Sequence, residues 1–250
     1  MTNSDVIRKI KTIDVWYHAI DLGDGVVTPG MYDMRPHVAE YRFPKSLAGQ
    51  RVLDVGASNG FFAFLFESLG AREVVATNLA RYQDHDYPKW FLERELARYS
   101  QSELQRIDSQ QSVGGFEVAR EILKSRVVHK LTTVYRLRDS VEGVFDFAFC
   151  GSLLVHLRDP VLALESIREV VRPGGRVIVA TSMDATAPEQ SYAIFNGKPE
   201  QVSWWVMSRE CLVRMCRMAG FDDIRWTGSF LAKSVHGFVD QIGIVSMIRP

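Results

Sequence analysis

The stretch Arg51-Val-Leu-Asp-Val-Gly-Ala-Ser-Asn-Gly60 decides the fold of this chain of 250 residues, together with the apolar run 61–67 that follows it. A short apolar segment ends at Val55, small residues from Gly56 onward turn the chain, and the next run is long enough for a helix. A strand, a tight loop of small residues and a helix, in this order, form the first unit of a nucleotide-binding α/β sheet. Such a loop lets a ligand approach the backbone closely.

The loop has more than one interpretation. A dinucleotide site would need G-x-G-x-x-G directly after the strand, whereas this chain has D-x-G-x-S-x-G. That pattern resembles the first motif of class I S-adenosylmethionine-dependent methyltransferases, D/E-x-G-x-G-x-G, with a serine in place of the middle glycine. The alternative is an ordinary strand-to-helix turn. The resemblance implies a loop beside the methionine part of S-adenosylmethionine, with contacts from Asp54, Gly56, Ala57, Ser58 and Gly60.

The rest of the chain alternates between strand-like and helix-like segments. We expect further strands at 73–77, 127–135, 144–150, 176–181, after residue 221 and at 239–248, with helices at 60–69, 116–123, 160–170 and 208–219. Residues 145–156 and 171–179 resemble the fourth and fifth motifs of the same methyltransferase class at the proper spacing. The expected fold class is therefore α/β: a Rossmann-like seven-stranded sheet, mostly parallel with an antiparallel last strand, and helices on both faces.

Two regions lie outside this pattern. Residues 1–50 precede the sheet, and we expect a helix over 5–16 and then a structured lid or cap segment. Residues 51–250 would be the methyltransferase domain. Within it, residues 81–115 are long for a strand-to-helix connection, which usually takes two to six residues. We interpret them as an insertion that covers the site, with a helix near 90–99.

Three segments resemble one branch of this class, the bacterial proteins related to the tRNA wobble-uridine methyltransferase that makes 5-oxyacetyl-type uridines. They are residues 16–30, 52–60 and 154–160. The resemblance implies a carboxylated cofactor for the tRNA enzyme, held in part by a tyrosine before the histidine of Leu-Tyr-His. Here that place is Val155, which cannot donate a hydrogen bond. We therefore expect S-adenosylmethionine itself and a small-molecule acceptor, with tRNA modification and non-catalytic cofactor binding as alternatives.

Composition limits the other possibilities. Thirty basic and thirty acidic side chains give no net charge, so the chain lacks a global electrostatic signature for nucleic acid. No run approaches the length of a membrane span, and the N-terminus lacks the apolar centre of a secretory signal. Three cysteines without C-x-x-C spacing argue against disulfide frameworks and zinc knuckles. A cytoplasmic protein without a bound metal is the expectation.

The resemblance also implies further cofactor-binding residues. The second strand of the family normally ends in an acid that binds the ribose, and Asn78 occupies that place, beside Leu79. We expect its amide oxygen to accept one hydrogen bond without charge assistance. Beyond the third strand, the adenine would lie near Tyr135 and Arg136. The end of the fourth strand adds two more candidates, Cys150 and Gly151.

Catalysis needs correct positioning and a base where the acceptor carries a proton. Histidine titrates near neutrality, so His156 and His18 are the candidate bases, and structural histidines are the alternative. Candidate substrate contacts, for which core packing or surface ion pairs are the alternative, are Trp16, Tyr17, Arg35, Phe195, Trp204 and Trp205. The run Asp84-His85-Asp86 has residue types found in metal sites, but we expect it to be a solvated loop.

Overall fold

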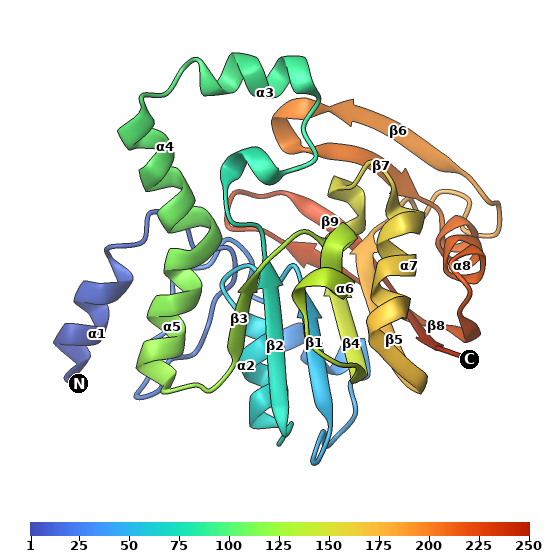
Figure 1. Cartoon of the computed structure of the whole chain (residues 1–250), viewed down its shortest axis with the longest axis horizontal. Helices are drawn as coiled ribbons and strands as arrows, with labels where there is room; N and C mark the ends of the chain where they lie inside the picture. Colours follow the sequence, from blue (N-terminus) through green and yellow to red (C-terminus); the bar gives the residue numbers. More distant parts are fainter.

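A seven-stranded sheet forms the centre of the computed structural model, which describes residues 1–250 apart from the side chains of 110–112 (Figure 1). The strands lie in the order β3-β2-β1-β4-β5-β9-β8. Neighbours from β3 to β5 are parallel, and β9 is antiparallel to both β5 and β8. The predicted fold class is confirmed. The strands are β1 (Arg51–Val55), β2 (Glu73–Asn78), β3 (Val128–Leu131), β4 (Phe145–Gly151), β5 (Val171–Ser182), β8 (Asp222–Lys233) and β9 (Val239–Ile248).

Both faces of the sheet are buried because alternate residues of its strands point to opposite sides. Val52 and Phe149 belong to the core under the helices α2 (Phe61–Ser68) and α5 (Gly115–Leu123). Leu53 and Cys150 belong to the opposite core, which α6 (Leu137–Ser140), α7 (Pro160–Val170) and α8 (Arg209–Met218) cover (Figure 1). The carboxyl ends of β1, β2 and β4 therefore meet at one edge, the upper edge in Figure 1.

The segment before β1 is packed into the core. The helix α1 (Asn3–Ile10) is shorter than expected, and the 3-10 helix η1 (Arg35–Tyr41) packs on β8. Tyr41 makes aromatic contacts with Phe62 and Phe149, so this segment covers the α2 side of the sheet. Whether residues 1–50 act as a lid stays a prediction.

The insertion has more structure than one helix. It contains η2 (Tyr82–Asp84), α3 (Lys89–Leu96), α4 (Gln101–Ile107) and the π-helix η3 (Asp108–Gly114), which continues into α5. Two elements differ from expectation. The segment after β3 is a 3-10 turn, η4 (Val134–Arg136), because the Thr133 hydroxyl accepts from the N–H of Tyr135. A separate hairpin, β6 (Ala193–Lys198) and β7 (Ser203–Met207), joined through η6 (Pro199–Gln201), follows β5.

Candidate active site

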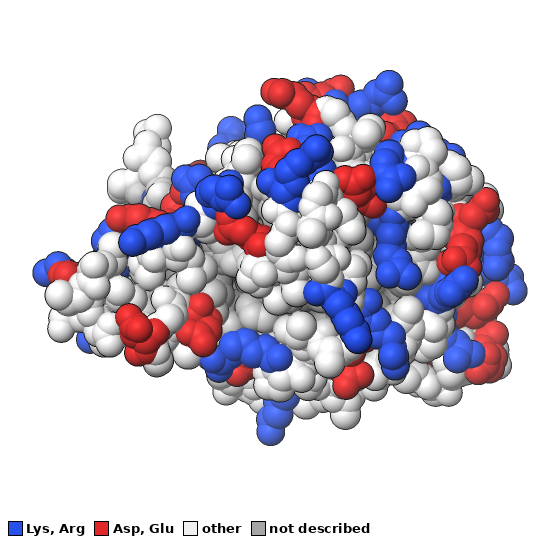
Figure 2. Space-filling model, turned by 90° about the horizontal axis from the view of Figure 1, so that it is seen from below, with Lys and Arg blue, Asp and Glu red and all other residues white. Residues whose placement is uncertain are grey.

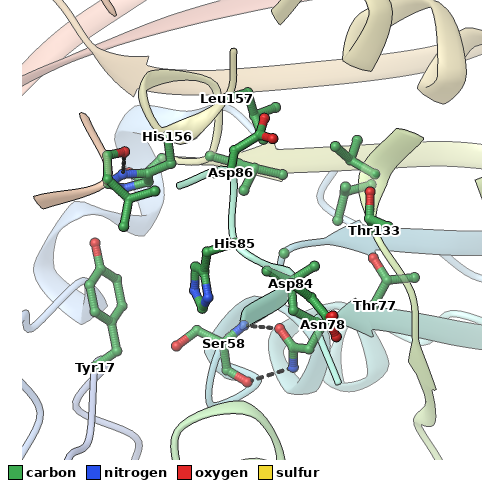
Figure 3. Close-up of a pocket in the computed structure, with 18 of the residues that line it drawn as sticks. Tyr17, Ser58, Thr77, Asn78, Asp84, His85, Asp86, Thr133, His156 and Leu157 are labelled. Atoms are coloured by element: carbon green, nitrogen blue, oxygen red, sulfur yellow. Dashed lines mark hydrogen bonds between the residues drawn. The ribbon is translucent and has the colours of Figure 1, made fainter. Parts of the chain in front are cut away.

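A cavity of about 560 Å³ opens at the carboxyl edge of the sheet (Figure 3). Its walls come from the loop after β1, the ends of β2 and β4, the turn after β3, the insertion and the N-terminal segment. This is the edge at which open α/β sheets bind ligands. Of the predicted residues, the cavity is lined by Tyr17, His18, Gly56, Ser58, Asn78, Leu79, Tyr135, Gly151 and His156.

The loop after β1 is held in a tight conformation. Gly56 has φ of 73° and Ser58 has φ of 51°. The carbonyl of Thr77 accepts hydrogen bonds from the N–H groups of Gly56 and Ala57, at 3.0 Å each. A side chain at Gly56 would point toward the cavity: its Cβ would have the Leu153 side chain as its nearest neighbour, at 3.3 Å. The loop thus needs small residues to keep its backbone open to the cavity.

Gly60 serves the fold instead of lining the cavity. It starts α2 with φ of 91°, and a Cβ there would lie 2.6 Å from the ring of Phe64 and 2.8 Å from that of Phe116. Gly60 and the buried Ala57 both lie outside the cavity lining, so their predicted contact with the cofactor stays a prediction.

Asn78 lines the cavity, but its amide is engaged with the loop. Its Oδ1 accepts from the Ser58 N–H at 2.7 Å, and its Nδ2 donates to the Ser58 carbonyl at 2.9 Å (Figure 3). The Nδ2 also lies 3.0 Å from Nε2 of His129, whose Nδ1 lies 2.9 Å from a carboxylate oxygen of Glu117. Asn78 thus clamps the loop, and His129 and Glu117 support it. That its amide oxygen also accepts a hydrogen bond from a ribose hydroxyl stays a prediction, because this oxygen has a second lone pair.

Asp54 lies beneath the loop and does not line the cavity. It is 1% exposed, accepts a hydrogen bond from the N–H of Ala63 in α2, and leaves Oδ2 without a partner among the described residues. Burial raises its pKa to about 8, partly opposed by the Ala63 hydrogen bond. Its carboxylate faces α2 and lies outside the cavity lining, so the predicted contact with the cofactor has no support in this geometry. Asp54 therefore supports the loop indirectly, through its hydrogen bond to the first turn of α2.

His156 lies in the 3-10 turn η5 (Leu154–His156) after β4, and Figure 3 shows it on the same side of the cavity as Tyr17, whose hydroxyl points toward it. Its Nδ1 is 2.9 Å from the carbonyl of Val202. A carbonyl only accepts, so Nδ1 carries the proton and Nε2 keeps its lone pair. Burial lowers the pKa of His156, and the carbonyl of Val202 opposes this in part. The side chain is therefore neutral at physiological pH, as a base must be before it takes a proton.

Tyr17 and His18 line the first cavity from the N-terminal segment. Burial and the charge of Asp240 raise the pKa of Tyr17 to about 12, so its hydroxyl stays protonated. Burial lowers the pKa of His18 to about 3, and its Nδ1 has no hydrogen-bond partner among the described residues. A histidine that resists protonation this strongly is a poor general base. The geometry thus favours a binding role for His18 and leaves His156 as the candidate base.

A second cavity of about 490 Å³ adjoins the first. Tyr17, Ser152, His156 and Gln201 line both, so they form the border between them. The second cavity extends under the hairpin β6–β7 toward Met31, Tyr32 and Asp240 among other residues. Neither cavity has a lysine or an arginine among the described residues that line it.

The other predicted contacts lie elsewhere. Cys150 is fully buried in the core under α7, and Arg136 lies near Asp139 outside the cavity lining. Trp16 is buried, with its indole N–H donating to the Ile10 carbonyl, and Arg35 pairs with Asp33 at the surface. None of these four residues lines either cavity, so the geometry does not support their predicted contacts. Core packing and a surface ion pair, which were the alternatives, account for these side chains.

The aromatic candidates lie in the hairpin above the site. Phe195 is 59% exposed and packs against Trp204 and Trp205. The Trp204 indole donates to the carbonyl of Asp86, and that of Trp205 to the carbonyl of Arg158. None of the three lines either cavity, so the geometry does not support the predicted direct contact with a substrate. They fix the hairpin to the insertion and to the segment after η5.

The insertion contributes residues that sequence reasoning placed in solvent. Asp84, His85 and Asp86 line the first cavity. Asp86 accepts from the Tyr135 hydroxyl at 2.7 Å and from the Arg158 N–H at 2.9 Å, which ties the insertion to two neighbouring loops. The residues that we did not expect at either cavity also include Asn59, Tyr32 and Asp240. Only the long gap before α5 indicated such a cover.

Within the described part of the chain, no group of three metal-ligating side chains could hold a metal ion. No helix there is long and apolar enough to cross a membrane. Figure 2 shows the face at the amino ends of the strands, where basic and acidic side chains are interspersed.

The comparisons with known proteins agree with this geometry. A methyltransferase domain family matches residues 32–225, which is most of the chain. The chain therefore belongs to this family, and the predicted class, the S-adenosylmethionine-dependent methyltransferases, is confirmed. In fold it is similar to the N-terminal domain of EvdMO1, solved with S-adenosylhomocysteine bound, with a TM-score of 0.64, 17% identity, and coverage of 100% of this chain and 98% of that one.

The relatives that are similar in sequence are tRNA U34 carboxymethyltransferases, and this similarity does not identify the methyl acceptor of this chain. The chain is 30% identical to the tRNA U34 carboxymethyltransferase of Syntrophotalea carbinolica over 76% of its length and 48% of that protein's. It is 28% identical to the enzyme of the same name from Campylobacter hominis, over 54% of this chain and 37% of that protein. The chain thus spans half or less of the length of these relatives.

Proposed function

We propose that this protein transfers a methyl group from S-adenosylmethionine to a small-molecule acceptor, with the cofactor in the first cavity and the acceptor in the second. The observation that carries the proposal is the shared border: Tyr17, Ser152 and His156 line both cavities. Methyl transfer needs the two reactants in contact and in line. Two adjoining cavities with a neutral histidine between them meet that requirement.

The first cavity fits the cofactor on the evidence of this chain. The loop from Gly56 to Ser58 keeps its backbone free of side-chain cover, and a Cβ at Gly56 would reach only Leu153. His18 presents a buried Nδ1 without a partner among the described residues, and Tyr135 and Leu79 provide aromatic and apolar surface. When bound, the cofactor supplies an electrophilic methyl group on a sulfonium. The protein positions the reactants and manages the acceptor's proton.

The role of His156 follows from its hydrogen bond. The Val202 carbonyl fixes the proton on Nδ1, so Nε2 keeps a lone pair for the acceptor's proton. Tyr17 remains a neutral phenol that can donate a hydrogen bond to a ligand.

The lining argues for methyl transfer instead of carboxymethyl transfer to tRNA. A transferred carboxylate or a nucleic-acid phosphate is best stabilised by Arg or Lys. Neither residue is found among the described residues that line the cavities, and Val155 lines the second one with an apolar side chain. The runner-up, a non-catalytic cofactor-binding protein, finds support in the clamped Asn78.

Calorimetry and a turnover assay test the proposal together. We expect S-adenosylhomocysteine to bind the folded protein, and S-adenosylmethionine to be converted to it in the presence of a panel of small acceptors. No binding at millimolar ligand would refute the cofactor assignment. Tight binding without turnover across the panel would favour the non-catalytic alternative. Turnover only with tRNA would refute the small-molecule acceptor.

A further inference from the structure

The second cavity contains a carboxylate with an uncommitted oxygen. Asp240 lies at the start of β9, and its Oδ2 accepts from the Tyr32 hydroxyl at 2.8 Å. No other side-chain hydrogen bond or ion pair of Asp240 is found among the described residues. Because that hydrogen bond uses Oδ2, the other carboxylate oxygen of Asp240 is available to a ligand in the second cavity.

The surroundings of Asp240 suit a positive charge. Tyr17 and Tyr32 face the same cavity with their ring centroids 5.3 Å apart, and Phe238 lines it from the β8–β9 turn. Aromatic faces attract ammonium groups, and this attraction grows when the group is desolvated. Since no described lysine or arginine lines this cavity, a bound anion would face Asp240 without compensation.

His156 lines the same cavity at its border with the first one, and the charge of Asp240 acts on it. The cavity therefore has a cation-binding side and a proton-accepting side. A molecule that satisfies both needs two separate polar groups: an ammonium group and a nucleophilic O–H or N–H.

Resting on the proposed function, we propose that the acceptor is a small amine whose ammonium group binds Asp240 and whose separate hydroxyl or second amine is methylated beside His156. In the reaction, the nucleophile's lone pair forms the bond to the methyl carbon, and its proton passes to Nε2 of His156. The electrons of the broken carbon–sulfur bond stay on sulfur, which leaves S-adenosylhomocysteine. The anchored ammonium keeps its proton and has no lone pair, so it is not methylated.

Three probes isolate the charge requirement. Tyramine, 4-ethylphenol and 4-hydroxyphenylacetate share a phenol and carry an ammonium, a methyl and a carboxylate at the far end. With saturating S-adenosylhomocysteine present, we expect calorimetry to show tyramine binding at least about tenfold more tightly than the other two, which equals about 1.4 kcal/mol. Asp240→Asn should reduce this preference to less than about threefold. Its amide oxygen still accepts from Tyr32, so the fold is maintained.

Asp223→Asn is the matched control, because Asp223 lies at the start of β8, pairs with Arg225 and lines neither cavity. It should leave the tyramine preference unchanged. Equal affinities for the three probes, no probe binding at millimolar concentration, or a preference that survives in Asp240→Asn would overturn the inference. In each of these cases S-adenosylhomocysteine would still bind and the proposed function would stand. Loss of that binding in the wild type would instead overturn the proposed function, and the inference with it.

Discussion

Asn78→Asp separates what the family pattern implies from what the contacts imply. An acid is usual at the end of β2, so the pattern favours tighter cofactor binding in the variant. Here the Nδ2 group donates to the Ser58 carbonyl at 2.9 Å and lies 3.0 Å from Nε2 of His129. A carboxylate oxygen in its place would lose both hydrogen bonds and face the carbonyl oxygen. At about 0.5–1.5 kcal/mol for each bond, we expect about 1–3 kcal/mol of lost stability.

Urea unfolding and calorimetry with S-adenosylhomocysteine measure the two effects of this variant. We expect a lower free energy of unfolding and weaker binding, because the Ser58 loop loses its clamp. Both losses should shrink as the pH falls, since a protonated His129 would donate to the new carboxylate. Asn3→Asp, at an exposed position of α1, is the charge-matched control and should change neither quantity. Tighter binding with unchanged stability would refute the clamp and restore the ribose assignment.

Four further variants test other parts of the site. Gly60→Val should prevent folding, because its Cβ would lie 2.6 Å from the Phe64 ring; circular dichroism tests this, and a folded variant would contradict the packing. Gly56→Val should remain folded but lose S-adenosylhomocysteine binding, which calorimetry tests. The pKa of Asp54 is raised from 3.8 to about 8. As the pH rises between these values, wild-type stability should therefore fall relative to that of Asp54→Asn, by about 1.4 kcal/mol per pH unit; parallel stability–pH curves would contradict this. His156→Asn should lower kcat at least about tenfold with little change in cofactor affinity. In the wild-type pH–rate profile, the acid limb should lie below the ordinary histidine pKa of about 6.5, because burial lowers the pKa of His156; an acid limb above that value would contradict this.

The sequence predicted the sheet well because its strands are short apolar runs bounded by glycine, as at Val52 and Gly56. It predicted the cavity edge for the same reason, since parallel strands place their carboxyl ends together. It could not show the hydrogen bonds of the Asn78 amide, because its partners Ser58 and His129 come from a separate loop and a separate strand.

The residues whose surroundings the sequence did not predict have a common feature: their contacts are tertiary. Aromatic side chains such as Trp16 and Trp204 are equally suited to a substrate wall and to packing, and only the tertiary contacts decide between them. Asp240 and Tyr32 are separated by 208 positions and carry no local pattern, so no motif could bring them together. Asp54 matched its motif, but the strand's alternation turned it toward α2.

The arrangement of the two cavities is tested most directly by a crystal structure of the protein with S-adenosylhomocysteine. We expect its homocysteine part beside Gly56 and Ser58, with the sulfur facing the second cavity at the border formed by Tyr17 and His156. A sulfur that faces away from this border, or a ligand bound in the second cavity, would contradict the proposed division between cofactor and acceptor.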